Sequence, residues 1–199
     1  MQKMHWDPKL GHMAQGLTNK CNINHSAEFQ RLYEGSPCGE NILTSPVPIS
    51  WKAAVKRWEK EKNFLDFGVG AIDGEVVAHY TQLAAGNTYT VGCSVSLCPV
   101  DNTEVVFYVC LYYTIGNKAS ALYTPYIPGE PCSSCETACD GYNLCTNYCE
   151  HYDFFENCKE AEVYDLCYIK EITYFCPETC LCKVHAPYID PGDFDPSYA

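Results

Sequence analysis

Ten of the fifteen cysteines of this 199-residue chain lie between Cys132 and Cys182. Cytosolic thiols are kept reduced, so this density is typical of a protein made for an oxidising compartment. Zinc is the competing use of clustered cysteines. Cys132 and Cys135 form a CxxC pair, but no second CxxC follows, and the next cysteines continue at other intervals. The pattern therefore favours disulfides, with the last third of the chain held by sulfur bridges instead of a hydrophobic interior.

The charge of the chain is −12 and is unevenly spread. Residues 132–199 carry 13 acidic side chains against three lysines and no arginine. Nucleic acids and anionic membranes attract basic patches, so this composition argues against both as partners. No apolar run approaches the roughly 18 residues that a transmembrane helix needs. Residues 1–6 also lack the apolar core of a signal peptide, so we expect an incomplete or processed N-terminus.

Two amphipathic helices are predicted in the first third. Leu10, Met13, Ala14, Leu17 and Cys21 recur at steps of three and four residues, and the same step continues to His25. A second helix is expected after Ser50, a residue type that caps helix N-termini. Its predicted buried face comprises Trp51, Ala54, Val55 and Trp58. Glu61 closes that apolar stripe, where a carboxylate indicates a ligand, a partnered ion or a local cap.

Strands are predicted over 89–95 and 104–113, which are rich in β-branched and aromatic residues, with turn residues between them. Helices followed by strands favour an α+β class. A Pro/Gly linker covers 123–131, and residues 153–163 have the composition of one or two short helices. The tail from 186 on is expected to be extended or disordered.

Several motifs resemble the CAP superfamily of cysteine-rich secretory, antigen 5 and pathogenesis-related proteins. Ala78–Leu83 followed by Thr88–Cys93 is similar to a signature of that superfamily. Further matches, in the family's order, are Asn19–Cys21, Asn24–Ser26, Cys38–Ile42, Trp58 with Glu61, and Tyr108–Cys110 leading to Gly116 and Asn117. The cysteine pattern from Cys132 to Cys182 resembles the hinge and cysteine-rich domain of the cysteine-rich secretory proteins.

The resemblance implies a CAP α-β-α sandwich, then a disulfide-rich hinge and a small helical cysteine-rich domain. The implied bounds are 1–123 for the CAP domain, 124–144 for linker and hinge, 145–183 for the cysteine-rich domain and 184–199 for an extended acidic tail. The family's first helix has no counterpart before Met1, so the CAP domain is expected to be N-terminally truncated.

The resemblance also implies a disulfide pairing. The implied pairs are Cys21–Cys98, Cys93–Cys110, Cys132–Cys139, Cys135–Cys145, Cys149–Cys182, Cys158–Cys176 and Cys167–Cys180. Cys38 remains, because Tyr113 stands where the family has its partner. We expect Cys38 to be a buried thiol beside this tyrosine, with a reactive or intermolecular thiol as the alternative.

By the same resemblance, a central cleft would contain His25, Glu40, Glu61 and His79. Imidazole nitrogen and carboxylate oxygen both bind divalent cations such as Zn²⁺, so these four are the candidate metal ligands. The alternative is a polar network that stabilises the cleft. Asn24–Ser26 is also a glycosylation sequon, whose overlap with a cleft residue argues against its use.

The leading functional hypothesis is a secreted, non-enzymatic protein that binds an extracellular target, by resemblance an ion channel, in venom or reproductive fluid. Exposed aromatic residues of the cysteine-rich domain would be its anchors. The candidates are Tyr148, Tyr152, Phe154, Phe155, Tyr168 and Tyr174. One alternative is sterol or lipid carriage, weakened because Ala84-Ala85-Gly86 replaces a family tryptophan. A metal-dependent hydrolase with Glu61 as base is the other.

Overall fold

The computed structural model describes residues 1–100, 103–149, 151 and 153–182, and the chain divides into two compact units. The first holds residues 3–128, and the second holds the described residues from 129 to 182. The predicted tail, 184–199, lies outside the described residues. None of the helices described is both long and apolar enough to cross a bilayer.

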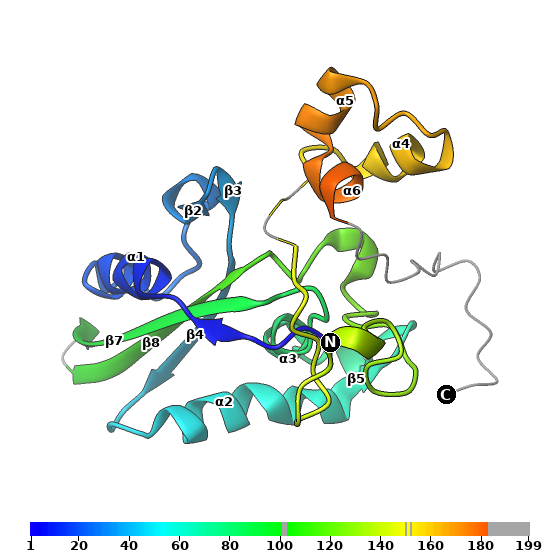
Figure 1. Ribbon diagram of the computed structural model, residues 1–199. Helices are drawn as coiled ribbons and strands as arrows, with labels where there is room; N and C mark the ends of the chain where they lie inside the picture. The colour runs from blue at the N-terminus through cyan, green and yellow to red at the C-terminus, as the bar shows by residue number, and fades with distance from the viewer. Residues whose placement is uncertain (101–102, 150, 152, 183–199) are drawn as a thin grey trace. The chain divides into compact units, whose positions relative to one another are not determined.

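The first unit is built around a four-stranded sheet with the order β1-β7-β8-β4 (Figure 1). Strand β1 pairs in parallel with β7, whereas β8 is antiparallel to both of its neighbours. The strands of this sheet are β1 (His5–Trp6), β4 (Gly39–Ser45), β7 (Thr90–Val100) and β8 (Thr103–Tyr113). Both strands predicted from the sequence are thus present as neighbours, and β7 runs five residues past its predicted end.

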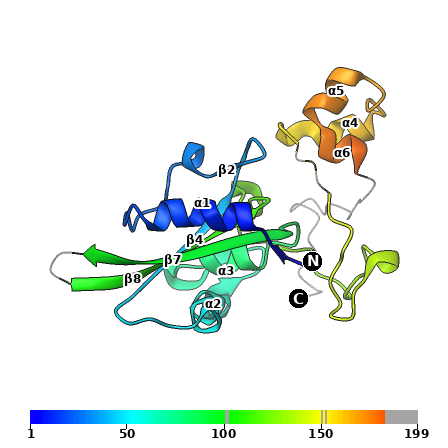
Figure 2. The ribbon, with the colours of Figure 1, turned by 60° about the vertical axis from the view of Figure 1, so that its left-hand side comes forward.

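Helix α1 (Pro8–Thr18) covers one face of the sheet, and α2 (Trp51–Glu59) with α3 (Ala78–Leu83) covers the other (Figure 2). Two small hairpins and several 3-10 turns complete the unit. They are η1 (Glu28–Gln30), β2 (Leu32–Tyr33), β3 (Ser36–Pro37), η2 (Lys60–Phe64), β5 (Leu65–Asp66), β6 (Gly70–Ala71), η3 (Ile72–Gly74) and η4 (Ala119–Ala121).

Strand β8 is buried on both faces from Val106 to Tyr113. Side chains alternate across a strand. The odd-numbered residues, among them Phe107 and Leu111, share one core cluster with Leu10 of α1. The even-numbered ones pack with Ala54 and Trp58 of α2 in two further clusters. The result is the predicted α-β-α sandwich.

The two predicted helices form, with corrections at their edges. The Ser50 hydroxyl caps α2 by accepting from the backbone N–H of Ala53, as expected. Trp51 and Val55 are not buried, however, and remain 38% and 39% exposed. Ala54 and Trp58 form the buried part of the stripe, and the exposed Trp51 ring packs edge-on against Tyr108 of β8 with 5.2 Å between ring centroids.

Helix α1 ends at Thr18, whereas the helical spacing of residues in the sequence continues for seven more residues, to His25. Cys21 has a φ of 51°, in the left-handed region that interrupts a helix. Its disulfide to Cys98 joins the segment after α1 to strand β7. His25 is therefore placed by a loop, and the helical prediction for it was wrong.

The second unit contains only short helices among its described residues. They are η5 (Glu136–Ala138), η6 (Glu156–Cys158), α4 (Lys159–Val163), α5 (Lys170–Phe175) and α6 (Pro177–Leu181). Isolated helices of this length are unstable in water. The buried residues of this helical part are Cys158, Ala161 and Cys176, so its interior is mainly cystine.

A pair of glycine substitutions tests how closely α1 packs on the sheet. A Cβ at Gly92 of β7 would lie 2.2 Å from the backbone nitrogen of Gly11 and 2.5 Å from the carbonyl carbon of Leu10. We expect Gly92→Ala to lower the free energy of unfolding by about 3 kcal/mol or more, because backbone atoms cannot move aside.

The matched control is Gly16→Ala on α1, where a Cβ meets no atom within 4 Å. Alanine is the better helix former, so this variant should be more stable by about 0.5–1 kcal/mol. Denaturant titration with the disulfides intact measures both values. Equal midpoints for Gly92→Ala and the parent protein would contradict the close packing.

Candidate functional site

His79 and Glu61 form one acid–imidazole pair. Glu61 Oε1 lies 2.7 Å from His79 Nδ1, and Oε2 accepts from the backbone N–H groups of His79 and Tyr80 at 3.0 and 3.1 Å. Helix α3 has no side-chain cap of its own, so this carboxylate satisfies its first N–H groups. The Trp58 indole stacks on the His79 ring, with 6.2 Å between centroids. Glu61 is therefore both a local cap and the partner of a histidine.

His25 and Glu40 form the second pair. Glu40 lies on β4, opposite Leu111 of β8, and its side chain is 2% exposed. Its Oε1 lies 2.7 Å from His25 Nδ1 and accepts from the Ser26 N–H at 3.0 Å. Its Oε2 accepts from the Ser26 hydroxyl at 2.7 Å. The buried carboxylate thus holds a loop whose histidine side chain is 62% exposed.

Sequence reasoning missed two residues that shape this loop. Ser26 supplies two of the three hydrogen bonds to Glu40. The Arg31 guanidinium donates to the carbonyl oxygens of Ser26 and Cys38, which joins the loop to the start of β4. The motif match around His25 included Ser26 without a role for it. A single arginine in an irregular segment carries no comparable signal.

The four predicted ligands are therefore arranged as two pairs. Among the described residues, Cys132, Cys135 and Cys145 form a group of three potential ligands whose donor atoms lie within 4.8 Å of one another. Those sulfurs are in disulfides, so they hold no zinc. The four predicted ligands form no such group. In each His–Glu pair Nδ1 faces the carboxylate, which leaves Nε2 as the nitrogen for an ion.

The cysteines are brought together in the same seven pairs that the resemblance implies. Two bridges lie in the CAP unit, Cys21–Cys98 and Cys93–Cys110. Two lie in the hinge, Cys132–Cys139 and Cys135–Cys145. Three cross-link the helical module, Cys149–Cys182, Cys158–Cys176 and Cys167–Cys180.

The predicted anchor residues of the helical module are exposed wherever the structure describes them. Exposed fractions are 37% for Tyr148, 59% for Phe154, 55% for Phe155, 79% for Tyr168 and 70% for Tyr174, and Tyr152 lies outside the described residues. Four rings follow one another, in the order Phe154, Tyr174, Phe175 and Phe155, with centroid separations of 6.3, 5.1 and 5.6 Å. We call these four residues the aromatic row.

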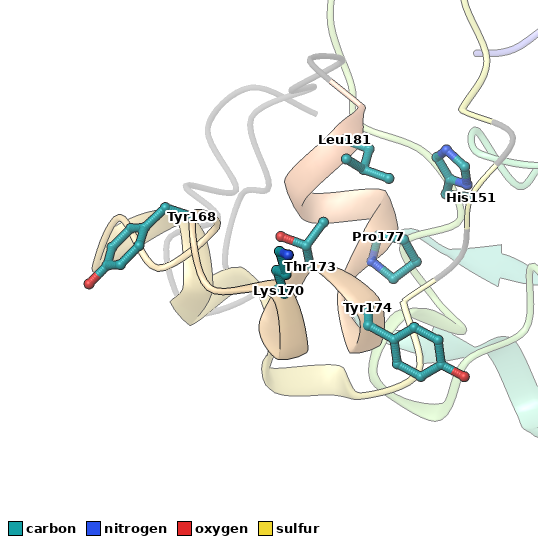
Figure 3. A pocket seen from close by; sticks show the side chains of 7 residues that line it. All are labelled: His151, Tyr168, Lys170, Thr173, Tyr174, Pro177 and Leu181. Carbon is teal, nitrogen blue, oxygen red and sulfur yellow. The ribbon is translucent and has the colours of Figure 1, made fainter.

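A pocket of about 390 Å³ lies beside the aromatic row, with α5 and α6 forming much of its wall (Figure 3). His151 and Lys170 are its basic groups, and no acidic side chain lines it among the residues that the structure describes. The lining residues are His151, Tyr168, Lys170, Thr173, Tyr174, Pro177 and Leu181.

Comparison with known proteins agrees with this architecture. The family model for the cysteine-rich secretory protein family, CAP, matches residues 1–112, and a second model, Crisp, matches residues 132–186. The chain belongs to the cysteine-rich secretory protein family.

Relatives of this family member match most of its length. Cysteine-rich secretory protein 3 of Homo sapiens is 39% identical over 92% of this chain and 74% of its own. The cysteine-rich venom protein helothermine of Heloderma horridum horridum is 36% identical over 92% of this chain and 75% of its own. The solved structure of NaASP2 with Zn²⁺ is 32% identical, has a TM-score of 0.57, and covers 73% of this chain and 77% of its own.

Cys38 is where this family member departs from the implied disulfide pattern. Its side chain is fully buried and lies in the same core cluster as Tyr113. Burial raises the pKa of the Cys38 thiol from 9.0 to about 12. Because the thiolate is the reactive form, the folded protein holds Cys38 in its inert state at neutral pH.

We expect a thiol reagent to label no cysteine in the folded protein at neutral pH and one per chain in denaturant without reductant. A thiol whose pKa is raised by folding stabilises the folded state while it stays protonated, and this stabilisation is lost as the pH rises from about 9 toward 12. Colorimetric thiol titration, with and without denaturant, measures the number of cysteines labelled per chain. Stoichiometric labelling of the folded chain would contradict the burial of Cys38.

Proposed function

We propose that this chain is a secreted, non-enzymatic binding protein that binds an extracellular target and modulates an ion channel through its cysteine-rich module. The observation that carries the proposal is the exposed aromatic row on a module cross-linked by three disulfides. Exposed aromatic clusters on soluble proteins mark interaction sites, and aromatic residues dominate binding energies at interfaces. The similarity to helothermine, a venom protein, supports the same reading.

The disulfides explain how so small a module would bind with useful affinity. Binding loses affinity when loops and side chains must be ordered on contact. Here Cys158–Cys176 and Cys167–Cys180 tie the helical segments to one another before any partner arrives. The rings of the aromatic row are also packed against each other, so little of their freedom remains to be lost.

The charge of the module indicates the kind of channel surface that it would bind. Residues 145–182 contain eight acidic side chains and two lysines. This surface complements a basic vestibule or turret, and it counts against plugging a cation pore with a lysine. Attraction between exposed charges is screened by salt, so affinity should fall as ionic strength rises.

Recording of channel currents with the full chain tests this proposal. Phe154→Ala together with Tyr174→Ala removes one stacked pair of the aromatic row, and we expect at least about a tenfold loss of potency, since anchor residues each contribute about 1–2 kcal/mol or more. Phe29→Ala is the matched control, because Phe29 is 75% exposed but lies in the CAP unit. Equal potency of all three proteins, or a potency independent of salt, would contradict the proposal.

A second candidate function is divalent metal binding by the His–Glu pairs. It is favoured by the carboxylate contact at each Nδ1, an arrangement that orients a histidine for an ion at Nε2. A solved relative is described with Zn²⁺. Since no three of the four donor groups come within 4.8 Å of one another among the described residues, at most two of them would ligate one ion together. We therefore propose weak binding, with water completing the coordination.

Isothermal titration with Zn²⁺ checks the metal site. His79→Ala should reduce the affinity about tenfold or more, because losing a side chain that only orients a metal ligand costs about 10–100-fold and losing a ligand costs at least as much. His12→Ala is the control, since His12 is exposed on α1. If both variants bind Zn²⁺ as the parent does, the His79–Glu61 pair is a structural network and not a metal site.

Two observations bear on the remaining alternatives. Both oxygens of Glu61 accept hydrogen bonds or contact His79, which supports a structural role and weakens its role as a catalytic base. A pocket of about 470 Å³ in the CAP unit is lined by Val55, Leu83 and Ala84 among other residues, with Glu59 as its acidic group. Sterol or lipid carriage stays a prediction, and this pocket is where a lipid would be sought.

A further inference from the structure

We propose that Asn24 carries an N-linked oligosaccharide, which would stand beside His25 at the edge of the His25–Glu40 pair. The inference rests on the secretion part of the proposed function. Asn24-His25-Ser26 is the single N-x-S/T sequon of the chain. Such a sequon is an acceptor for glycosylation in secreted proteins when it lies in an accessible loop.

The side chain of Asn24, the residue to be modified, has a different partner from the side chains of His25 and Ser26, which bind Glu40. Asn24 lies in the irregular segment between α1 and η1 and is exposed. Its side-chain amide donates to the Asn22 side-chain oxygen at 3.3 Å. An amide nitrogen carries two hydrogens, so one can be replaced by a sugar while the other keeps this contact. His25 and Ser26, by contrast, both contact Glu40. The overlap of the sequon with a cleft residue is therefore compatible with its use.

Glycosylation would have to take place before the Ser26 hydroxyl binds Glu40 in the folded protein. This hydroxyl is required by the sequon, but in the folded protein it donates to Glu40 Oε2 at 2.7 Å. Glu40 is positioned only when β4 pairs with β8, a strand that begins at Thr103. The neighbouring disulfide needs Cys98, which is synthesised 74 residues after Asn24. At 5–20 residues per second this leaves about 4–15 s in which the sequon is unfolded and available.

The transfer step uses a lipid-linked oligosaccharide pyrophosphate as donor. The Asn24 amide nitrogen forms a bond to C1 of the first sugar, and the bond between C1 and the pyrophosphate oxygen breaks. The lipid pyrophosphate leaves with its electron pair, and the amide proton passes to a base of the transferring enzyme. No oxidant or reductant takes part.

The consequence of the modification concerns His25. Its side chain is 62% exposed, whereas the side chain of His79 in the other pair is 25% exposed. A glycan on the adjacent residue would shield the more accessible of the two imidazoles from reagents and ions.

Mass spectrometry of the full chain tests the site, with a cleavable leader directing the chain into the secretory pathway of cultured cells. Peptide N-glycosidase in heavy-oxygen water should shift the secreted protein to faster migration and convert Asn24 to labelled aspartate. Asn24→Gln should lose the shift, and Ser26→Thr, which preserves the sequon, should keep it. Secreted parent protein that shows no shift overturns the proposal. Because the leader imposes secretion and no channel is used, this failure is distinct from failure of the proposed function.

Shielding of His25 is measured separately by reaction with diethyl pyrocarbonate. His12 is an internal reference, because it is exposed on α1 outside the sequon loop. The ratio of His25 to His12 modification should be lower in the glycosylated protein than in Asn24→Gln. Equal ratios would overturn the position assigned to the glycan beside His25.

Discussion

Strand β8 is the element on which the first unit depends, because both of its faces are buried under helices. A strand in this position requires apolar side chains on both sides, and the run from Val106 to Tyr113 supplies them. Its antiparallel pairing with β4 places Glu40 opposite Leu111. The face of β8 that carries Cys110 and Tyr112 packs against Trp58 of α2. The Trp58 indole in turn stacks on the His79 ring. The two His–Glu pairs are thus held by one strand.

The second unit is stabilised by a different means. Its helices have five or six residues and bury almost no aliphatic side chains, so covalent bridges replace a hydrophobic interior. Cross-links restrict the conformations of the unfolded chain, and they therefore stabilise the fold without requiring apolar side chains to be buried. The rings of the aromatic row remain at the surface as a consequence. Seven disulfides require an oxidising compartment, which agrees with the secreted role proposed for the chain.

Helices α1 and α2 and strands β7 and β8 could be predicted because their signals are local, whereas β1, β4 and α3 were not predicted as elements. Ser50 caps α2 through its own hydroxyl, and the β-branched and aromatic runs of β7 and β8 form strands wherever a core accepts them. The predicted burial of Trp51 and Val55 and the predicted helical position of His25 were wrong, because both predictions rested on periodicity alone. Periodicity shows that a stripe exists, but how far a helix runs and how much of its stripe is covered depend on the neighbouring sheet and on the turn at Cys21.

The amino-acid sequence by itself determined the fold family and indicated a chain of two parts made for an oxidising compartment, since cysteine number, motif order and composition are properties of the chain alone. The residues of the two His–Glu pairs were likewise recognisable from their motifs. Only the tertiary structure decided that Glu61 caps α3, that Ser26 and Arg31 shape the His25 loop, and that the four candidate ligands stand as two pairs. These arrangements depend on hydrogen bonds between residues up to 19 positions apart, which the register of β4 on β8 and the packing of α2 bring together.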